Sequence, residues 1–243
     1  MRQREQRIAE LIETVAEKSK GFTNPPIVVI GGYALRAHVP FSRFSRDCDF
    51  AMPQQKDWAI DKIEKWFPAL SAQTKEKHGS YGFLRLIKFI SGAGNKIKVS
   101  LDFMEGEVRG RKGDSVLIDE DFIVQSVQTT IHVGNLAIPV KVPSYEDYFI
   151  LKLMSSRPSD IRDIVALVAA KGIPDETRLR KRIAGIVNKP EQLSENLELV
   201  FKDLSDPRFV DSWRGTFVTE AFAEADKKRV RKELEALRKV KRA

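Results

Sequence analysis

The pattern of apolar residues changes at Pro143, and this change limits the folds open to the chain. Before it, short apolar runs and alternating segments predict strands with helices between them. From Ser144 onward, only helical patterns occur. Their breaks are Pro158, Gly172, Pro190 and Pro207. The sequence therefore predicts an α+β fold class, with an α+β domain over residues 1–143 and an all-helical domain over residues 144–243.

The first half contains a regular succession of expected elements. Helices are expected at 2–20, 33–38 and 57–66, and strands at 27–30, 47–52, 82–91, 96–104 and 129–142. The strands at 82–91 and 96–104 form a hairpin that turns within 91–95. The last segment is itself a hairpin that turns at Gly134-Asn135, and a loop is expected over 106–114.

The charge of the chain favours a polyanionic partner. Its 243 residues carry a formal net charge of +8. From Asp226 to the end, nine Lys or Arg residues stand against three acidic ones. A basic balance of this kind favours nucleic acid first. It also suits solvated helix faces, so charge alone leaves RNA binding open.

The same sequence indicates where the chain works. No apolar run approaches the roughly 18–20 residues that span a bilayer. The first residues are charged and amphipathic, unlike a secretory signal. The single cysteine, Cys48, excludes an intramolecular disulfide and suits a reducing compartment. We expect a cytoplasmic protein with no membrane partner. The histidines lack zinc-ligand spacing, and no P-loop motif is present.

Two carboxylates share one face of the strand expected at 47–52. Residues i and i+2 of a strand point the same way, so Asp47 and Asp49 lie together. Cys48 and Phe50 point to the opposite, apolar face. Two like charges this close repel each other, and a divalent metal is the usual compensating cation.

The strand expected at 96–104 supplies a candidate third carboxylate. Its apolar residues occupy 97, 99, 101 and 103, which leaves Asp102 on the polar face. If the two strands are neighbours, three carboxylates converge. Such a set can hold two Mg²⁺ or Mn²⁺ ions. Glu105 is an alternative third ligand, but it breaks the alternation.

The strand at 27–30 ends at Gly31-Gly32, and a helix follows. Glycine lets the backbone approach a phosphate closely, and a helix N-terminus offers free N–H groups to an anion. Alone, this motif is a weak signal. Followed at short range by a strand with Asp-x-Asp, it becomes a specific one.

Together, these motifs resemble the DNA polymerase β-like nucleotidyltransferase superfamily. Their form resembles that of the AbiEii-type and related minimal prokaryotic nucleotidyltransferases. The first segments that carry this likeness are Gly31-Gly32-x-Ala34 and Arg43-x-Ser45-x-Asp47-x-Asp49. The segment from Leu151 to Ile164 is similar to that group's helix pair with a Lys-Leu start and an Asp-x-x-Asp-Ile end. The likeness extends over about residues 28–168.

The resemblance implies a nucleotidyltransferase fold, a mixed β-sheet flanked by helices, followed by an all-helical domain. It implies that the catalytic and metal-binding residues are Asp47, Asp49 and Asp102. It implies that the nucleotide-binding residues are Gly31, Gly32, Arg43, Ser45, Lys152, Asp160 and Asp163. Two positions depart from the pattern: Tyr33 stands where the toxins often have serine, and Ser159 where a basic residue is usual.

Some of these residues also have purely structural interpretations. Lys152 lies on an apolar helix and could extend its ammonium group to the surface. Asp160 follows Pro158 and could cap a helix. Arg43 and Ser45 could belong to a solvated loop.

The leading hypothesis is an enzyme: a Mg²⁺-dependent nucleotidyltransferase that moves an NMP from an NTP to a hydroxyl acceptor. The acceptor would be RNA, for example a tRNA 3′ end in a toxin-like role with an antitoxin partner, or a protein. One alternative is nucleotidylation of a small molecule such as an antibiotic, although the charge of +8 disfavours a cationic acceptor. Another is an NTP- or RNA-binding module with little catalysis.

Overall fold

The computed structural model describes residues 2–40, 43–91 and 96–239. Contacts between Cα atoms divide the chain into two compact units. Unit 1 comprises Met1–Ala37, Phe44–Val108 and Leu117–Ser144. Unit 2 comprises His38–Arg43, Arg109–Val116 and Tyr145–Ala243.

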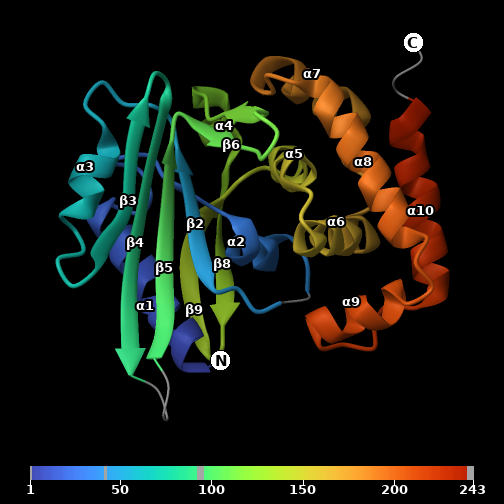
Figure 1. The fold of residues 1–243 in the computed structure, drawn as a ribbon, viewed down its shortest axis with the longest axis horizontal. Helices are drawn as coiled ribbons and strands as arrows, with labels where there is room; N and C mark the ends of the chain where they lie inside the picture. Colours follow the sequence, from blue (N-terminus) through green and yellow to red (C-terminus); the bar gives the residue numbers. More distant parts are fainter. Residues whose placement is uncertain (1, 41–42, 92–95, 240–243) are drawn as a thin grey trace. The chain divides into compact units, whose positions relative to one another are not determined.

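Unit 1 is built on a mixed five-stranded sheet in the order β1-β2-β5-β4-β3 (Figure 1). The strands are β1 (Val28–Ile30), β2 (Asp47–Met52), β3 (Ser71–His78), β4 (Tyr81–Ser91) and β5 (Lys96–Glu105). The pairs β1–β2, β3–β4 and β4–β5 are antiparallel, whereas β2 and β5 are parallel. The mixed sheet agrees with the sequence expectation.

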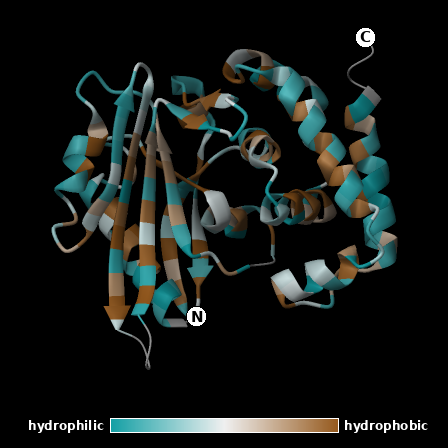
Figure 2. Cartoon of the chain, viewed as in Figure 1, coloured by the Kyte–Doolittle hydropathy of each residue, from teal (hydrophilic) through white to brown (hydrophobic). Residues whose placement is uncertain are grey.

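Helices cover one face of this sheet. The helices α1 (Arg2–Lys18) and α3 (Ala59–Glu64) pack against β5 and β4. Between the helices and the sheet lies a core that includes Ile12, Leu86 and Leu101, all fully buried. The alternation of the strands produces this core, and it appears as brown and paler bands along β4 and β5 in Figure 2. The residues between these positions belong to the opposite face of the sheet.

The remaining elements of unit 1 complete its sheet and core. They are α2 (Gly31–His38), α4 (Glu120–Gln125), β8 (Val127–Val133) and β9 (Leu136–Val142). The hairpin of β8 and β9 packs on α1 and β1 through β9. Two further short strands, β6 (Glu107–Arg109) and β7 (Ser115–Leu117), pair with each other, and each is divided between unit 1 and unit 2. The expectation of a loop over 106–114 is thus wrong in its first residues.

Sequence patterns did not predict β3. Seven of its eight residues are exposed, and its sequence SAQTKEKH contains no apolar alternation. It lies at the edge of the sheet, where a strand needs no buried face. The turn expected within 91–95 falls largely on residues 92–95, which lie outside the described residues.

Unit 2 consists mainly of helices. They are α5 (Tyr145–Ser155), α6 (Pro158–Lys171), α7 (Glu176–Ile186), α8 (Pro190–Leu204), α9 (Phe209–Phe217) and α10 (Glu224–Lys239). Pro158 and Pro190 begin α6 and α8, where the missing N–H costs nothing. Trp213 is fully buried and contacts the rings of Phe217 and Phe222. Within the described residues, no helix has the length and apolar character needed to cross a membrane.

Candidate functional site

The Asp pair lies on β2 as its alternation predicts. Cys48 and Phe50 are fully buried, whereas Asp47 and Asp49 are partly exposed on the other face. In the parallel pairing of β2 with β5, Asp49 stands opposite Asp102 and Asp47 opposite Ser100. The two strands are therefore neighbours, and the three carboxylates lie on one face of the sheet.

Gly31 leaves room for the Asp49 carboxylate. A Cβ atom built on Gly31 would lie 2.0 Å from Oδ2 of Asp49, far inside contact distance. The backbone there also has φ +67°, which disfavours residues with a side chain. Because β1 and β2 pair with Ile30 opposite Asp49, the chain turns into α2 directly beside this carboxylate. Gly32 is the next residue of α2 and is buried.

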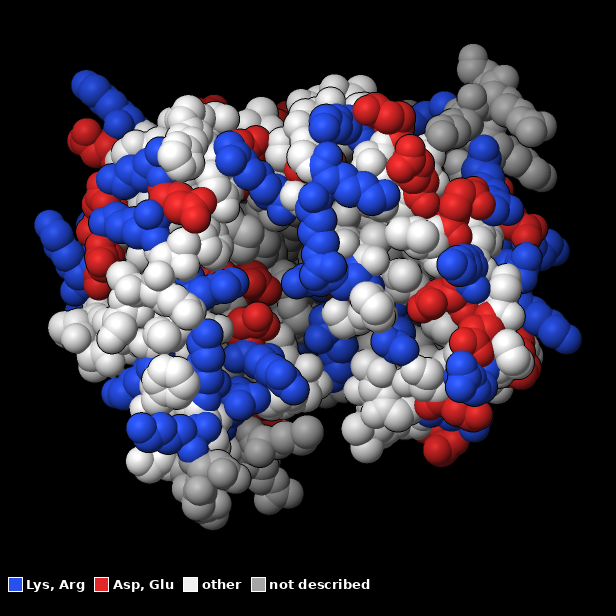
Figure 3. Space-filling model, in the orientation of Figure 1, with Lys and Arg blue, Asp and Glu red and all other residues white. Residues whose placement is uncertain are grey.

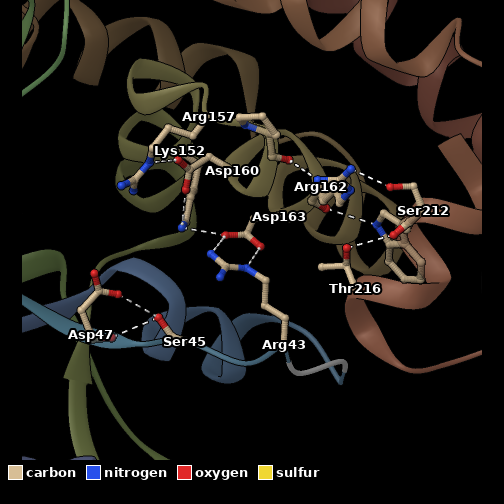
Figure 4. A network of polar contacts seen from close by, with 12 residues as sticks. Arg43, Ser45, Asp47, Lys152, Arg157, Asp160, Arg162, Asp163, Ser212 and Thr216 are labelled. Atoms are coloured by element: carbon tan, nitrogen blue, oxygen red, sulfur yellow. Dashed lines mark hydrogen bonds and ion pairs between the residues drawn. The ribbon is translucent and has the colours of Figure 1, made fainter. Parts of the chain in front are cut away.

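Ser45 is directed at the Asp pair. Its hydroxyl lies 3.2 Å from Oδ1 of Asp47 and 3.0 Å from the carbonyl oxygen of the same residue. Ser45 is 6% exposed, so this orientation is held in a buried setting (Figure 4). The serine therefore orients one carboxylate of the pair.

Arg85 is a charged member of this group that sequence patterns missed. It forms a two-pronged contact with Asp102: Nε donates to Oδ1 at 2.8 Å, and Nη2 bonds Oδ2. The pKa of Arg85 is raised, first by this hydrogen bond and further by the charges of Asp102, Asp47 and Asp49. In this structure, a guanidinium therefore accompanies the Asp102 carboxylate.

The donor set still suits magnesium. Asp47 and Asp49 offer carboxylate oxygens, the ligands that Mg²⁺ prefers. Among residues 2–40, 43–91 and 96–239, no three His, Cys, Asp or Glu side chains are arranged to hold a metal ion. Mg²⁺ is usually held by one or two carboxylates together with substrate phosphates and water. The Asp pair fits an ion of that kind, whereas both oxygens of Asp102 contact Arg85.

Glu105, the alternative third ligand, has another role. Its fully buried carboxylate accepts hydrogen bonds from the backbone N–H groups of Gln55, Ala59 and Ile60 at 3.0–3.1 Å. Ala59 and Ile60 are the first residues of α3, where backbone N–H groups lack helical partners, and Gln55 lies in the segment before the helix. Trp58, the N-cap residue, provides no side-chain bond. Glu105 therefore anchors α3 to β5.

Unit 2 contains a second group of the predicted residues, centred on Lys152. Its ammonium group lies 2.9 Å from Oδ1 of Asp160 and 2.7 Å from Oδ2 of Asp163 (Figure 4). All three side chains are 3% exposed or less. Lys152 therefore does not extend to the surface, and that structural interpretation is wrong.

Two arginines complete this group. Arg43 binds Asp163 with two parallel bonds, Nε to Oδ1 at 2.6 Å and Nη2 to Oδ2 at 2.7 Å. Arg157 donates from Nε to Oδ2 of Asp160 at 2.7 Å. Asp160 therefore binds two cations, and the helix-cap interpretation is wrong for it. We call Arg43, Lys152, Asp160 and Asp163 the buried quartet.

The charges of the quartet stabilise one another. Burial alone would lower the pKa of Lys152, but the charge of Asp163 and then that of Asp160 outweigh it and raise the pKa well above its usual value. Burial would raise the pKa of Asp160, yet Lys152 and Arg157 hold it well below its usual range. The four side chains carry two positive and two negative charges, so the quartet is neutral.

The predicted site residues thus fall into two groups. Unit 1 brings together Gly31, Ser45, Asp47, Asp49 and Asp102. Unit 2 brings together Arg43, Lys152, Asp160 and Asp163. Tyr33, where the toxins often have serine, is fully buried, and its ring contacts the Arg36 guanidinium at 5.0 Å.

Comparison with known proteins gives one family. The model of the nucleotidyl transferase AbiEii toxin of type IV toxin–antitoxin systems matches residues 15–238. Among solved structures, the crystal structure of JHP933 from Helicobacter pylori is similar, with 12% identity over 96% of this chain and 95% of that one, at a TM-score of 0.43. A candidate nucleotidyltransferase from H. pylori matches at 14% identity over 94% and 97%, with a TM-score of 0.45. No curated protein matches the chain.

Proposed function

Because the chain belongs to the AbiEii nucleotidyltransferase toxin family, we propose that it transfers an NMP from an NTP to a hydroxyl group of an RNA acceptor. One observation carries this proposal. Asp47 and Asp49 lie on one face of β2. Asp49 stands opposite Asp102 on β5 and beside a glycine that cannot be replaced without displacing it. This arrangement presents carboxylates next to a helix start that can approach phosphate.

The residues of unit 1 have distinct parts in the proposed reaction. Asp47 and Asp49 would hold a Mg²⁺ ion, which would supply Lewis-acid stabilisation of phosphoryl charge. Ser45 holds the Asp47 carboxylate in place, and Gly31 gives a phosphate access to the backbone. Asp102 would take the proton of the attacking hydroxyl. Arg85 occupies two of the roughly four lone-pair sites of that carboxylate and fixes its orientation.

In the proposed reaction, the buried quartet serves to hold side chains in position. Both carboxylates of the quartet bind the Lys152 ammonium, and Asp163 also holds the Arg43 guanidinium. We therefore assign Lys152 to holding Asp160 and Asp163 in place. The quartet also holds Arg43, which lies two residues before Ser45 in the sequence. Nucleotide binding by Arg43, Lys152, Asp160 or Asp163 remains part of this proposal.

RNA is the favoured acceptor on charge. The net charge of +8 suits a polyanion and disfavours a cationic small molecule such as an aminoglycoside. The family model names a toxin of a toxin–antitoxin system, which supports a toxin role and an antitoxin partner. Arrest of growth on expression, absent with Asp49→Asn, would be the matching cellular result. Unimpeded growth with the intact protein would contradict a toxin role.

Labelled NTPs test the proposed chemistry directly. Each of the four NTPs is incubated with the protein, Mg²⁺ or Mn²⁺, and one acceptor class: total RNA, protein or a hydroxylated small molecule. We expect label in RNA with the wild type and none with Asp49→Asn, which keeps the size of the side chain but removes its charge. Label found only in protein or only in the small molecule would overturn the RNA acceptor. No transfer in any combination would overturn the enzyme.

The contact between Arg85 and Asp102 favours a second candidate, an NTP-binding module without transfer. If this contact persists when an NTP is bound, both oxygens of the third carboxylate stay engaged. Calorimetry separates the two candidates. NTP binding that is equal with and without Mg²⁺ would favour the binding module, whereas Mg²⁺-dependent binding lost in Asp47→Asn would favour the enzyme.

A further inference from the structure

Among the described residues, one face of β4 carries partly or fully exposed side chains, and we call it the open face. On β5 the same face is exposed at Lys96 and partly at Lys98, whereas Ser100 and Asp102 are buried there. The helices α1 and α3 pack on the other face, where Leu84, Leu86 and Val99 are fully buried. On the open face, β4 presents alternating residues that are partly or fully exposed. They are Tyr81, Phe83, Arg85, Ile87 and Phe89. The pairing with β5 runs without a bulge from Gly82 to Ser91, so this alternation is unbroken.

Aromatic rings stand at both ends of this row. Tyr81 and Phe83 are parallel, with an interplanar angle of 6° and ring centroids 6.4 Å apart. The Arg85 guanidinium lies 5.5 Å from the centroid of the Phe83 ring. At the other end, Phe89 is 57% exposed. A single exposed apolar residue is ordinary, but aligned rings on one sheet face offer stacking surfaces.

Basic side chains accompany the exposed ring. Lys98 stands opposite Phe89 and Lys96 opposite Ser91, so both lysines share the open face. The Lys98 ammonium donates to the amide oxygen of Gln73 at 3.1 Å. Gln73 is neutral, so this bond does not neutralise the charge of Lys98. Figure 3 shows Lys and Arg side chains gathered over the lower part of β3 to β5. Positive charge and an aromatic ring thus occur together.

The carboxylates lie between the two aromatic ends. Asp102 stands opposite Arg85, and Asp49 is next to Asp102 on the neighbouring strand. Phe83 and Phe89 lie on either side of Arg85 along β4. At about 3.3 Å per residue, they are roughly 20 Å apart. A chain of nucleotides lying along β4 would therefore pass the Asp pair.

We propose that this open sheet face, formed by Tyr81, Phe83, Phe89, Lys96 and Lys98, binds the acceptor as single-stranded RNA. Bases stack on the rings of Phe83 and Phe89, and Lys96 and Lys98 contact phosphates. A duplex hides the faces of its bases, so the open sheet face selects unpaired RNA. This inference rests on the proposed function, because it names the form of acceptor that the site would use.

Binding of a labelled single-stranded RNA of about 12 nucleotides, a length within the range of known single-strand sites, tests the stacking part. Fluorescence anisotropy is measured without NTP or divalent metal. Phe89→Leu removes the ring but keeps an apolar side chain, and we expect Kd to rise about tenfold. Phe89→Trp keeps a ring and should bind as the wild type does. Val124→Ala, at a site 79% exposed on α4, is the control for loss of exposed apolar surface.

The salt dependence of the same binding tests the phosphate contacts. The slope of log K against log salt is negative, and removing one phosphate contact makes it less steep by about 0.7 for a single strand. We expect this decrease for Lys96→Ala and for Lys98→Ala. Lys62→Ala, at an exposed position on α3, should leave the slope unchanged.

The possible results separate this inference from the proposed function. Equal RNA affinity for the wild type, Phe89→Leu and Lys98→Ala would overturn the open sheet face as a binding surface, even if transfer to RNA is observed. The expected losses of affinity without any nucleotide transfer would support the surface and overturn the proposed enzyme. Equal or tighter binding of a blunt RNA duplex would also overturn the selection of single strands.

Discussion

Gly31 has a hydrogen atom in place of a side chain, and this leaves the space that the Asp49 carboxylate occupies. A methyl group there would meet Oδ2 of Asp49 at 2.0 Å, so Gly31→Ala must displace the carboxylate. We expect this variant to lose nucleotide transfer at least as fully as Asp49→Asn. The measurement is label incorporation by the folded protein, with folding checked by circular dichroism.

Gly21→Ala is the matched control for this prediction. Gly21 has φ +73°, like the φ +67° of Gly31, but nothing lies within 4 Å of its added Cβ. Both variants carry the strain of a side chain at positive φ, roughly 1 kcal/mol. Only one of them moves Asp49. Equal activity in the two variants would contradict the proposed importance of this contact.

Glu105 provides a second prediction at the residue scale. Its buried carboxylate accepts hydrogen bonds from two backbone N–H groups at the start of α3 and from that of Gln55 before the helix, so Glu105→Ala leaves those donors without this partner. We expect the free energy of unfolding to fall by about 3 kcal/mol, in the range for bonds to a charged group. Urea denaturation measures it. Transfer by the folded fraction should persist, and its loss would show that Glu105 serves the reaction.

The sequence was sufficient to predict the carboxylates of unit 1, and it also contained the signal for their partner, Arg85. Asp47, Asp49 and Asp102 follow from alternation, because an i, i+2 pattern fixes the face. Arg85 was missed, although the expected hairpin contained the signal. Pairing Ser91 with Lys96 places Arg85 opposite Asp102. Alternation predicts the face of a residue, whereas only the register of two strands predicts its partner.

At the scale of elements, Lys152 joins α5 to α6. Lys152 belongs to α5, and its ammonium group binds Asp160 and Asp163, both on α6. Removing one member of a buried ionic group typically costs about 3–5 kcal/mol. Asp160 and Asp163 would each keep an arginine, so we expect Lys152→Met to lower the free energy of unfolding by about 3 kcal/mol. Lys202→Met, at an exposed position of α8, should change it little.

The same pair of helices should show a characteristic dependence on pH. The folded pKa of Asp160 lies below its unfolded value of about 3.9, so its ionisation stabilises the protein above that pH. The stabilisation is lost as the pH falls through the folded pKa. We expect the difference in unfolding free energy between the wild type and Asp160→Asn to be constant above about pH 5 and to shrink in more acidic solution. A constant difference down to about pH 2 would contradict this role.

Elements with a buried face were predictable, and those without one were not. The core positions of β4 and β5 repeat every second residue, which is the signal that the sequence carries. β3 has no such signal, because it gains its hydrogen bonds from β4 at the sheet edge and buries little. The bond from Arg43 to Asp163 joins residues 120 positions apart, and no local pattern predicts such a contact.

At the scale of the whole molecule, the chain divides its chemistry between two units. It passes from unit 2 to unit 1 between Arg43 and Phe44. The eight residues that begin at Arg43 therefore include a member of the buried quartet and the Asp pair. If the quartet positions this segment for the reaction, Arg43→Met should reduce the rate of transfer more than it reduces stability. Lys202→Met is again the control, and a loss of stability without a loss of rate would assign Arg43 to structure alone.

We propose that Asp47 and Asp49 carry nucleotidyl transfer to RNA. One experiment measures both products of this reaction: labelled NMP incorporated into RNA and pyrophosphate released, for the wild type, Asp49→Asn and Asp119→Asn. Asp119 caps α4 through the N–H of Phe122, so its variant removes an acidic group that has no part in the proposed reaction. We predict equal amounts of incorporated NMP and pyrophosphate for the wild type and Asp119→Asn, and neither product for Asp49→Asn. Undiminished incorporation by folded Asp49→Asn would contradict the claim.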